Sequence, residues 1–186
     1  MEQEDELIIR SAEARDFLPL QQLCERRFGS GYLDKEDFEN RLRYPELFLV
    51  ADCGGQPVAA VSMTPEAPDS LARAMQMTEK EVLSAARGKP TIHFRSAITA
   101  EGFEGRGLIQ ILLSRVIENA RRLGYGLILS PNWKYDGKIP AGKIHDRLGF
   151  VNIGERENLW LNQKGYSCVY CKGPCRCTAV LYQLQL

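Results

Sequence analysis

The sequence predicts an α/β (α+β) fold, a mixed sheet with helices on its faces. Three observations lead to this fold class. Short β-prone runs alternate with amphipathic segments, the apolar positions of the longest such segment recur at helical spacing, and a Gly-Gly pair separates two apolar runs as in a hairpin. The length of 186 residues is typical of one domain, so residues 1–186 are expected to fold as a single unit.

The N-terminal elements are expected to be a strand followed by two helices. LIIR at 7–10 suits a strand, and Asp16 is a candidate N-cap for a helix that ends before Gly29. The segment 34–44, DKEDFENRLRY, predicts the second helix, which Asp34 would open.

A hairpin and a long connection are expected next. FLVADCGGQPVAAVSM at 48–63 holds two β-prone runs around its glycine pair, the strongest hairpin signal in the chain. Residues 63–90 are interpreted as an irregular connection with one helix, for which Thr78 and Glu81 form a capping box.

The remaining elements alternate strand and helix. TIHFRSAIT at 91–99 predicts a strand, and an amphipathic helix runs from Gly107 to a C-terminal cap at Gly124. The expected order then continues with a strand at 126–130, a polar loop at 131–138, a short helix between Pro140 and Gly149, and a cysteine-rich hairpin at about 166–186.

Charge and hydropathy exclude several classes of partner. Lys plus Arg equal Asp plus Glu at 24 each, without a long block of one sign, which argues against nucleic acid and against a polybasic membrane patch. The start, MEQEDELIIR, is acidic and lacks the features of a signal peptide, and no apolar run approaches the ~20 residues of a membrane helix. A cytoplasmic protein is expected, and pairing into a homodimer is left open.

The stretch ITAEGFEGRGLIQILL at 98–113 has the order strand, glycine turn, helix. The free N–H groups of a first helical turn converge on one point, where the helix dipole also favours negative charge. Glycine removes the Cβ atoms that would keep phosphate oxygens away. The stretch lacks the Lys-Ser/Thr pair of a P-loop, and its spacing does not fit a dinucleotide fingerprint.

This arrangement resembles the acyl-CoA motif of the GNAT (Gcn5-related) N-acetyltransferase superfamily. The apolar start, the acidic residue, the aromatic and both turn glycines match that motif, at Ile98, Glu101, Phe103, Gly105 and Gly107. Three positions depart from it, because Ala100 replaces Pro, Glu104 stands where Arg or Gln is usual, and Ile109 replaces a small residue.

A second family signature follows the next strand. It consists of Ala141, His145 in the place of the family's Tyr, and the closing pair Gly149 and Phe150. The resemblance covers residues 7 to about 151 and implies a mostly antiparallel central sheet flanked by helices. It further implies an N-acyltransferase, most simply an acetyltransferase, that moves an acyl group from acetyl-CoA to an amine by direct attack.

The resemblance also assigns roles to residues. Acyl-CoA would be held by the end of the motif strand, the turn and the start of the helix, at Ile98, Thr99, Ala100, Gly105, Arg106, Gly107, Leu108 and Ile109. A backbone N–H near Ile98 would bind the oxyanion. His145, in the Tyr slot, would protonate the leaving thiolate.

The general base and the activity itself have competing interpretations. His93 and Glu101 are candidate bases, although His93 between apolar neighbours also suits a buried histidine and Glu101 also suits a turn cap. Because Glu104 and Ile109 depart from the motif, a degenerate acyl-CoA-binding or interaction module without catalysis is the alternative function. Acyl transfer from a carrier protein is a further one.

Four of the six cysteines fall in SCVYCKGPCRC near the C-terminus. Cys168 and Cys171 have the C-x-x-C spacing of a metal knuckle, and Cys175 and Cys177 follow a Lys-Gly-Pro turn, so the four are expected to bind a structural zinc. A reduced hairpin, a redox disulfide and an iron–sulfur centre are the alternatives. Cys24 and Cys53, in apolar surroundings, are expected to be small buried hydrophobes.

Overall fold

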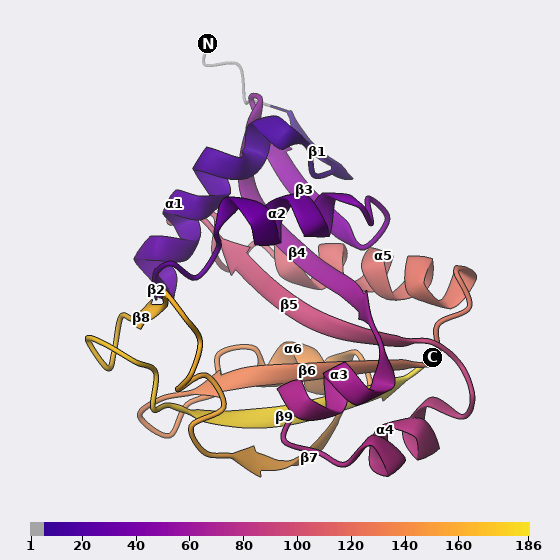
Figure 1. The fold of residues 1–186 in the computed structure, drawn as a ribbon. Helices are drawn as coiled ribbons and strands as arrows, with labels where there is room; N and C mark the ends of the chain where they lie inside the picture. The colour runs from indigo at the N-terminus through magenta and orange to yellow at the C-terminus, as the bar shows by residue number, and fades with distance from the viewer. Residues whose placement is uncertain (1–5) are drawn as a thin grey trace.

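The computed structural model describes residues 6–186, so the first five residues of the acidic start lie outside the described part. Its centre is a seven-stranded sheet in the order β1-β3-β4-β5-β6-β9-β7 (Figure 1). The strands are β1 Leu7–Ser11, β3 Phe48–Cys53, β4 Gln56–Glu66, β5 Thr91–Thr99, β6 Leu127–Lys134, β7 Val151–Arg156 and β9 Thr178–Gln185, with a short separate pair made by β2 Gly29–Ser30 and β8 Ser167–Cys168. Only β5 and β6 pair in parallel, so the expected mixed, mostly antiparallel sheet is confirmed.

The helices cover both faces of this sheet. They are η1 Ala14–Asp16 (a 3-10 turn), α1 Phe17–Arg27, α2 Lys35–Leu42, α3 Pro68–Ala74, α4 Glu79–Ala86, α5 Leu108–Arg122 and α6 Gly142–Arg147. One face packs against the apolar stripe of α5 and against Phe150, which follows α6. The opposite face carries α1 and α2 over β3 and β4, and α3 and α4 over β6 and β9.

The central strands β5 and β6 separate along their length. They pair only from Thr91 to His93 on β5, and beyond that point the two strands diverge. Immediately after, the β4–β5 register jumps from Met63 opposite Phe94 to Ser62 opposite Ser96, so Arg95 is an extra residue on β5. Such a bulge bends a strand. The middle of the sheet therefore has an open edge on β5 from Phe94 onward.

Three local expectations need correction. The 63–90 connection carries two helices rather than one, because β4 continues to Glu66 and a Pro at the start of α3 opens a helix that the sequence reading missed. The polar segment 131–138 is partly strand, since β6 runs to Lys134 beside β9. Asp16 does not cap α1 with its side chain, which is buried and accepts hydrogen bonds from Arg10 and the Glu13 amide.

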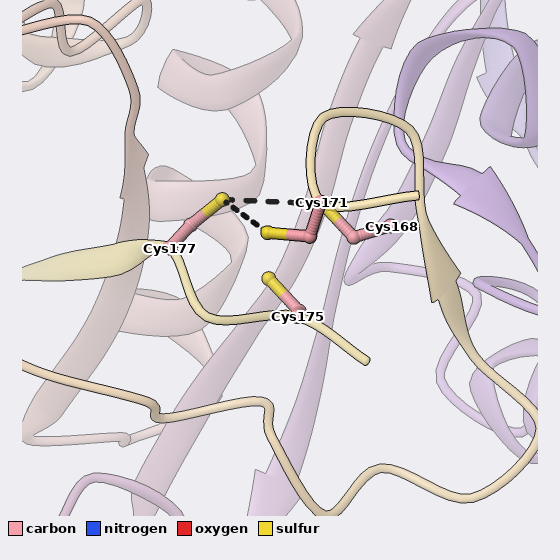
Figure 2. Close-up of side chains that lie close together, drawn as sticks. All are labelled: Cys168, Cys171, Cys175 and Cys177. Carbon is pink, nitrogen blue, oxygen red and sulfur yellow. Dashed lines mark hydrogen bonds between the residues drawn. The ribbon is translucent and has the colours of Figure 1, made fainter. Parts of the chain in front are cut away.

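The cysteine-rich tail does not form the expected hairpin. β8 pairs with β2, whereas β9 inserts between β6 and β7, so the two tail strands are not neighbours. The loop between them brings the four cysteines together at one place (Figure 2). Elsewhere, Cys24 is buried as expected and Cys53 is partly exposed. No described helix combines the length and apolarity needed to cross a bilayer.

Candidate functional site

A pocket of about 660 Å³ opens where β5 and β6 separate. Its two long walls are β5 from His93 to Thr99 and β6 from Pro131 to Trp133. The remaining wall comes from α1, α2 and the segment 159–166, and it is rich in aromatic side chains, namely Phe28, Tyr32, Trp160 and Tyr166. A ligand entering here would be enclosed by elements from the N-terminal, central and C-terminal parts of the chain.

The glycine turn lies at the end of β5, as predicted. Gly105 and Gly107 both have φ of +75°, and a Cβ built at either position would meet no atom within 4 Å. The hydrogen-bond ladder of α5 begins with the Ile111 N–H donating to the Gly107 carbonyl at 3.1 Å. The amides at 108–110 therefore have no acceptor inside the helix. Open space and free amide donors are what an anionic group requires.

Glu104 lines the pocket, but the turn uses its carboxylate. One oxygen accepts a hydrogen bond from the Gly102 amide at 2.9 Å. Arg106 donates to the Gly102 carbonyl at 3.0 Å, and its guanidinium lies 4.7 Å from the centre of the Phe103 ring. The acidic residue at the unusual motif position thus stabilises the turn, with a cation two residues away.

The other residues expected to hold acyl-CoA divide between pocket and core. Ile98, Thr99 and Ile109 line the pocket, whereas Leu108 is buried beneath α5. The Ala100 amide donates to the Val58 carbonyl at 2.7 Å.

That single bond fixes the direction of the other amides of β5. In an antiparallel pair, hydrogen-bonded and non-bonded positions alternate. Ile98, opposite Ala60, therefore bonds to β4 as Ala100 does, while the amides of Ala97 and Thr99 point to the open edge of β5. The pocket receives two backbone donors that flank Ile98.

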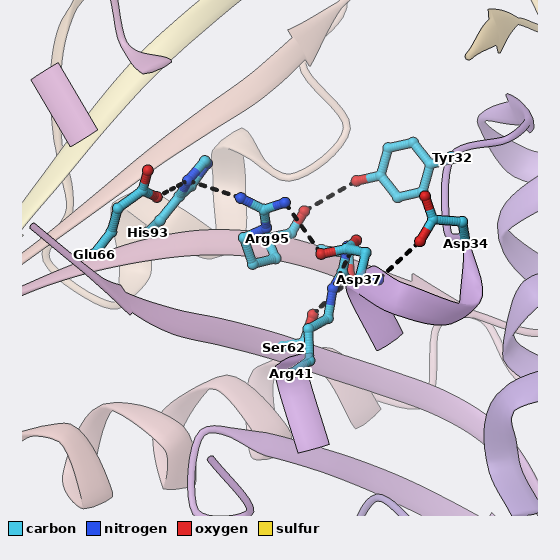
Figure 3. Close-up of polar contacts among 9 residues, drawn as sticks. Tyr32, Asp34, Asp37, Arg41, Ser62, Glu66, His93 and Arg95 are labelled. Atoms are coloured by element: carbon cyan, nitrogen blue, oxygen red, sulfur yellow. Dashed lines mark hydrogen bonds and ion pairs between the residues drawn. The ribbon is translucent and has the colours of Figure 1, made fainter. Parts of the chain in front are cut away.

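His93 lines the pocket from β5 and contacts the end of β4 (Figure 3). Its Nδ1 lies 2.7 Å from Oε2 of Glu66, and Ser70 donates to the other Glu66 oxygen at 2.6 Å. Burial acts to raise the pKa of Glu66, but His93 and Ser70 outweigh it and lower that pKa to about 2. Burial also lowers the pKa of His93, and the Arg95 charge outweighs part of the opposing effect of Glu66.

These shifts define the protonation state of the pair at neutral pH. Glu66 is a carboxylate and His93 is neutral, so the His93 proton sits on Nδ1 and is donated to Glu66. Nε2 is then an unprotonated nitrogen, and it makes no hydrogen bond to any residue in the described part of the chain. A neutral imidazole oriented by a carboxylate has the form of a general base.

A second charged group lies beside this pair. Arg95 donates to Asp37 at 3.3 Å, and Asp37 also pairs with the buried Arg41 (Figure 3). Arg41 in turn donates to Ser62 and Ser96, both at 2.8 Å. Burial acts to raise the pKa of Asp37, but the two guanidinium groups outweigh it and lower that pKa. Asp37 is therefore an anion that is already neutralised.

His145 lies behind the pocket wall rather than in it. Its side chain is 1% exposed and packs against Phe94, Phe150 and Tyr182. Nδ1 lies 2.9 Å from the Ala141 carbonyl, which can only accept, so the proton is on Nδ1 and Nε2 accepts from Ser130 at 2.9 Å. Burial lowers the pKa of His145, which keeps the ring neutral. Its predicted catalytic role stays a prediction.

The candidate acid and bases are thus not brought together. Phe94 packs on His145, and His93 is its neighbour along β5, so the two histidines face opposite sides of the sheet. Glu101 is exposed in the turn and is not among the described residues that line the pocket. Of the three predicted catalytic residues, only His93 lines it.

The four tail cysteines form a compact group of sulfurs. All four Sγ atoms lie within 4.8 Å of one another, and the four side chains point to a common centre (Figure 2). Cys168 and Cys175 are buried, whereas Cys171 is exposed. Trp133, which lines the pocket, packs against the same cluster. The predicted ligand set is therefore spatially possible as one site.

Sequence reasoning missed the partners of His93. Arg95 could have been found, because residues two apart on a strand share a face. Glu66 and Asp37 could not, since their approach depends on β4–β5 pairing and on how α2 docks. Neither carries a local pattern that distinguishes it from an ordinary exposed acid.

Comparisons with known proteins agree with this geometry. A family model described as "Acetyltransferase (GNAT) family" matches residues 14–150. A search of curated proteins found no match.

Several solved structures are similar to the chain in fold. Ribosomal-protein-alanine N-acetyltransferase from Brucella melitensis is 21% identical with a TM-score of 0.66, covering 97% of this chain and 100% of that one. Arabidopsis thaliana Naa50, in complex with the bisubstrate analogue CoA-Ac-MVNAL, is 12% identical with a TM-score of 0.68, covering 97% and 99%. Drosophila melanogaster polyamine N-acetyltransferase is 17% identical with a TM-score of 0.62, covering 97% and 100%.

Proposed function

The chain belongs to the acetyltransferase (GNAT) family, and from this premise we propose that it transfers an acetyl group from acetyl-CoA to an amine held in the β5–β6 pocket. The observation that carries the proposal is His93, a neutral, carboxylate-oriented imidazole with a free Nε2 in that pocket. When bound, acetyl-CoA supplies the acetyl group as a thioester. The paragraphs below concern the chain's own residues.

The glycine turn fits the pyrophosphate of CoA. Gly105 and Gly107 leave open space above the backbone, and the amides at 108–110 are free to donate. Arg106 adds a positive charge, and Glu104 is held by the Gly102 amide. Thr99 and Ile109 line the pocket next to this turn. These features support the set of acyl-CoA residues expected from the sequence.

We assign His93 as the general base. Its Nε2 accepts a proton from the acceptor amine, and Glu66 stabilises the imidazolium that results through the 2.7 Å contact with Nδ1. The oxyanion donors are assigned to the backbone amides of Ala97 and Thr99, which point to the open edge of β5. Base and donors thus lie on one strand, four to six residues apart.

The acid for the leaving thiolate is the least supported assignment. His145 has both ring nitrogens engaged, and its proton is held by the Ala141 carbonyl. Any proton that it supplies must pass by way of Ser130 and Asn132, of which Asn132 lines the pocket. We retain His145 as a candidate that acts through these two side chains.

The base also points to a class of acceptor. A histidine with a lowered pKa is a weak base, so it suits an amine that loses its proton easily. A peptide α-amine has an ordinary pKa about 2.5 units below that of a lysine-like alkylamine. The charged side chains that line the pocket include three arginines against two carboxylates, so a polycation is not favoured: Arg27, Arg41 and Arg95 against Asp37 and Glu104. We therefore propose a peptide N-terminus as acceptor.

Release of CoA from acetyl-CoA, measured with an amine panel, tests this function. The panel contains a short peptide with a free N-terminus, the same peptide with a blocked N-terminus, a polyamine and an arylalkylamine. We expect turnover with the free peptide, and at least ~10-fold lower kcat/KM with the polyamine, since each pKa unit is worth about 1.4 kcal/mol.

A parallel binding titration with acetyl-CoA separates the alternatives. Binding without turnover on any amine would support the non-catalytic acyl-CoA-binding module instead. Turnover only with an acylated carrier protein, and no binding of acetyl-CoA, would support the carrier-dependent reaction.

A further inference from the structure

We propose that Cys168, Cys171, Cys175 and Cys177 bind one zinc ion, and that this ion fixes the C-terminal wall of the pocket. Tetrahedral zinc with Zn–S bonds of about 2.3 Å requires S···S separations of about 3.8 Å. The Cys177 sulfur lies 3.9 Å from that of Cys168 and 3.6 Å from that of Cys171. All four sulfurs lie within 4.8 Å of one another (Figure 2).

The same distances disfavour a pair of disulfides. A disulfide bond needs about 2.05 Å between sulfurs, and all four thiols are free. The two short contacts also share Cys177, so the cluster does not divide into two separate pairs. Four soft ligands around one centre, without an open position, match a structural zinc site.

Donors around the cluster suit thiolate sulfur. The Arg176 amide donates to the Cys171 sulfur at 3.3 Å, and the amides of Tyr170 and Cys171 donate to Cys168. Such N–H···S contacts orient the ligands of a metal and stabilise their charge. The exposed cations Lys172 and Arg176 add positive charge beside four thiolates that a single divalent ion does not fully neutralise.

One buried donor near the cluster lacks an acceptor. The indole N–H of Trp133 is buried and makes no hydrogen bond within the described residues, and the Cys177 sulfur is the polar group that it approaches. A buried unpaired N–H costs free energy, and a metal-bound thiolate is a stronger acceptor than a thiol. Trp133 thus gives an observation independent of the cysteine spacing.

The cluster is joined to the pocket through β8. A Cβ at Gly29 would lie 1.9 Å from the Ser167 carbonyl oxygen, so β2 and β8 pack without room for a side chain. The Val169 amide and the Tyr166 hydroxyl both donate to the Phe28 carbonyl at 3.0 Å. Tyr166 and Phe28 line the pocket. An ion that holds Cys168 to Cys177 therefore also holds this wall to β9.

Metal content tests the site directly and does not depend on activity. The full chain, without a histidine tag and purified without added metal, is expected to contain one zinc per chain by mass spectrometry of the elements. Cys171→Ser, which alters the most exposed of the four ligands, should lower zinc well below one per chain, whereas the control Cys53→Ala, on β3, should retain it.

A cobalt-substituted sample extends the test to geometry. Replacing the ion with Co²⁺ should give the intense visible bands of a tetrahedral thiolate site. Zinc far below one per chain in the wild-type protein, iron in its place, or the loss of four free thiols to disulfides would each overturn the proposal. Because the wild-type measurement needs no variant, misfolding of Cys171→Ser does not obscure the answer.

The effect on the pocket wall rests on the proposed function and is measured separately. In Cys171→Ser, KM for the acceptor should rise at least ~10-fold while the dissociation constant for acetyl-CoA stays within about twofold, because the glycine turn lies on another element. Stoichiometric zinc with an unchanged acceptor KM would overturn the role in the wall. An inactive wild-type protein that still holds zinc would overturn only the proposed function.

Discussion

Nδ1 of His93 lies 2.7 Å from Oε2 of Glu66, and this contact joins β5 to the end of β4 at the edge of the pocket. The contact fixes the tautomer of the imidazole and directs the unprotonated Nε2 away from Glu66. It also couples the charge of a carboxylate with a pKa of about 2 to a histidine whose pKa burial lowers. The first two predictions follow from this pair.

Replacing His93→Gln removes the proposed base and keeps a polar side chain of similar size. We expect kcat/KM for the amine to fall about 10²–10⁴-fold, the usual contribution of a general base. The affinity for acetyl-CoA should stay unchanged, because the glycine turn is elsewhere. Steady-state kinetics beside calorimetric titration check this, and a wild-type rate in His93→Gln would remove the base from the mechanism.

Replacing Glu66→Gln should shift the pH profile of kcat/KM. The base works unprotonated, so activity falls as the pH drops through the pKa of His93, which lies below its ordinary 6.5. Glu66 acts to raise that pKa, and its loss should move the acid limb of the profile to still lower pH. The exposed Glu79→Gln on α4 is the control, and an acid limb that moves upward contradicts the assigned tautomer and charge.

Replacing Gly105→Val should weaken acetyl-CoA binding. The substitution places a branched side chain at φ +75°, in the open space above the turn. The matched control is Gly55→Val in the β3–β4 hairpin, where φ is +84° and the space is equally open. We expect the dissociation constant for acetyl-CoA to rise at least ~10-fold in Gly105→Val only. Equal effects in both variants would mean that backbone strain alone is responsible.

Replacing Glu104→Gln tests the departure from the family motif. The amide oxygen of Gln can still accept from the Gly102 amide, so the turn is kept while one negative charge is lost. Since exposed charge interactions are small, we expect acetyl-CoA to bind about twofold to fivefold more tightly at low salt. Titrations at low and high salt check this, and weaker binding would show that the carboxylate itself assists the ligand.

Replacing His145→Phe separates a structural role from a catalytic one. The substitution breaks contacts with Ser130 and the Ala141 carbonyl in the core, which should lower the free energy of unfolding by about 1–3 kcal/mol. Well below the melting temperature, a rate within about twofold of wild type would reject the proton-donor role that the sequence suggested. A large loss of kcat in fully folded protein would support relay through Ser130 and Asn132.

Local patterns predicted most of the fold. The hairpin around Gly54 and the helix that follows Gly107 have signals in consecutive residues, and both formed where expected. The Lys134 end of β6 did not, because its polar residues form a strand only when β9 pairs with them. The β2–β8 pair has no local pattern either, since two residues on each side meet only after the chain has folded.

The site was predictable to the extent that it is backbone. The glycine turn and the cysteine group follow from spacing along the chain, and the structure brings each set together. The environment of a side chain is different, because it depends on what docks against it. His93 and His145 have similar apolar neighbours in sequence, yet one faces a pocket beside Glu66 and the other is enclosed by aromatic rings.

The place of β9 between β6 and β7 has a consequence for the order of assembly. During synthesis, both neighbouring strands leave the ribosome before β9, and in the finished sheet neither is hydrogen-bonded to the other. β6 therefore waits with an unpaired edge, which in an unfinished chain invites pairing with other nascent strands. Closure of this half of the sheet becomes a late, post-translational event, and a chaperone that shields β6 would act in that interval.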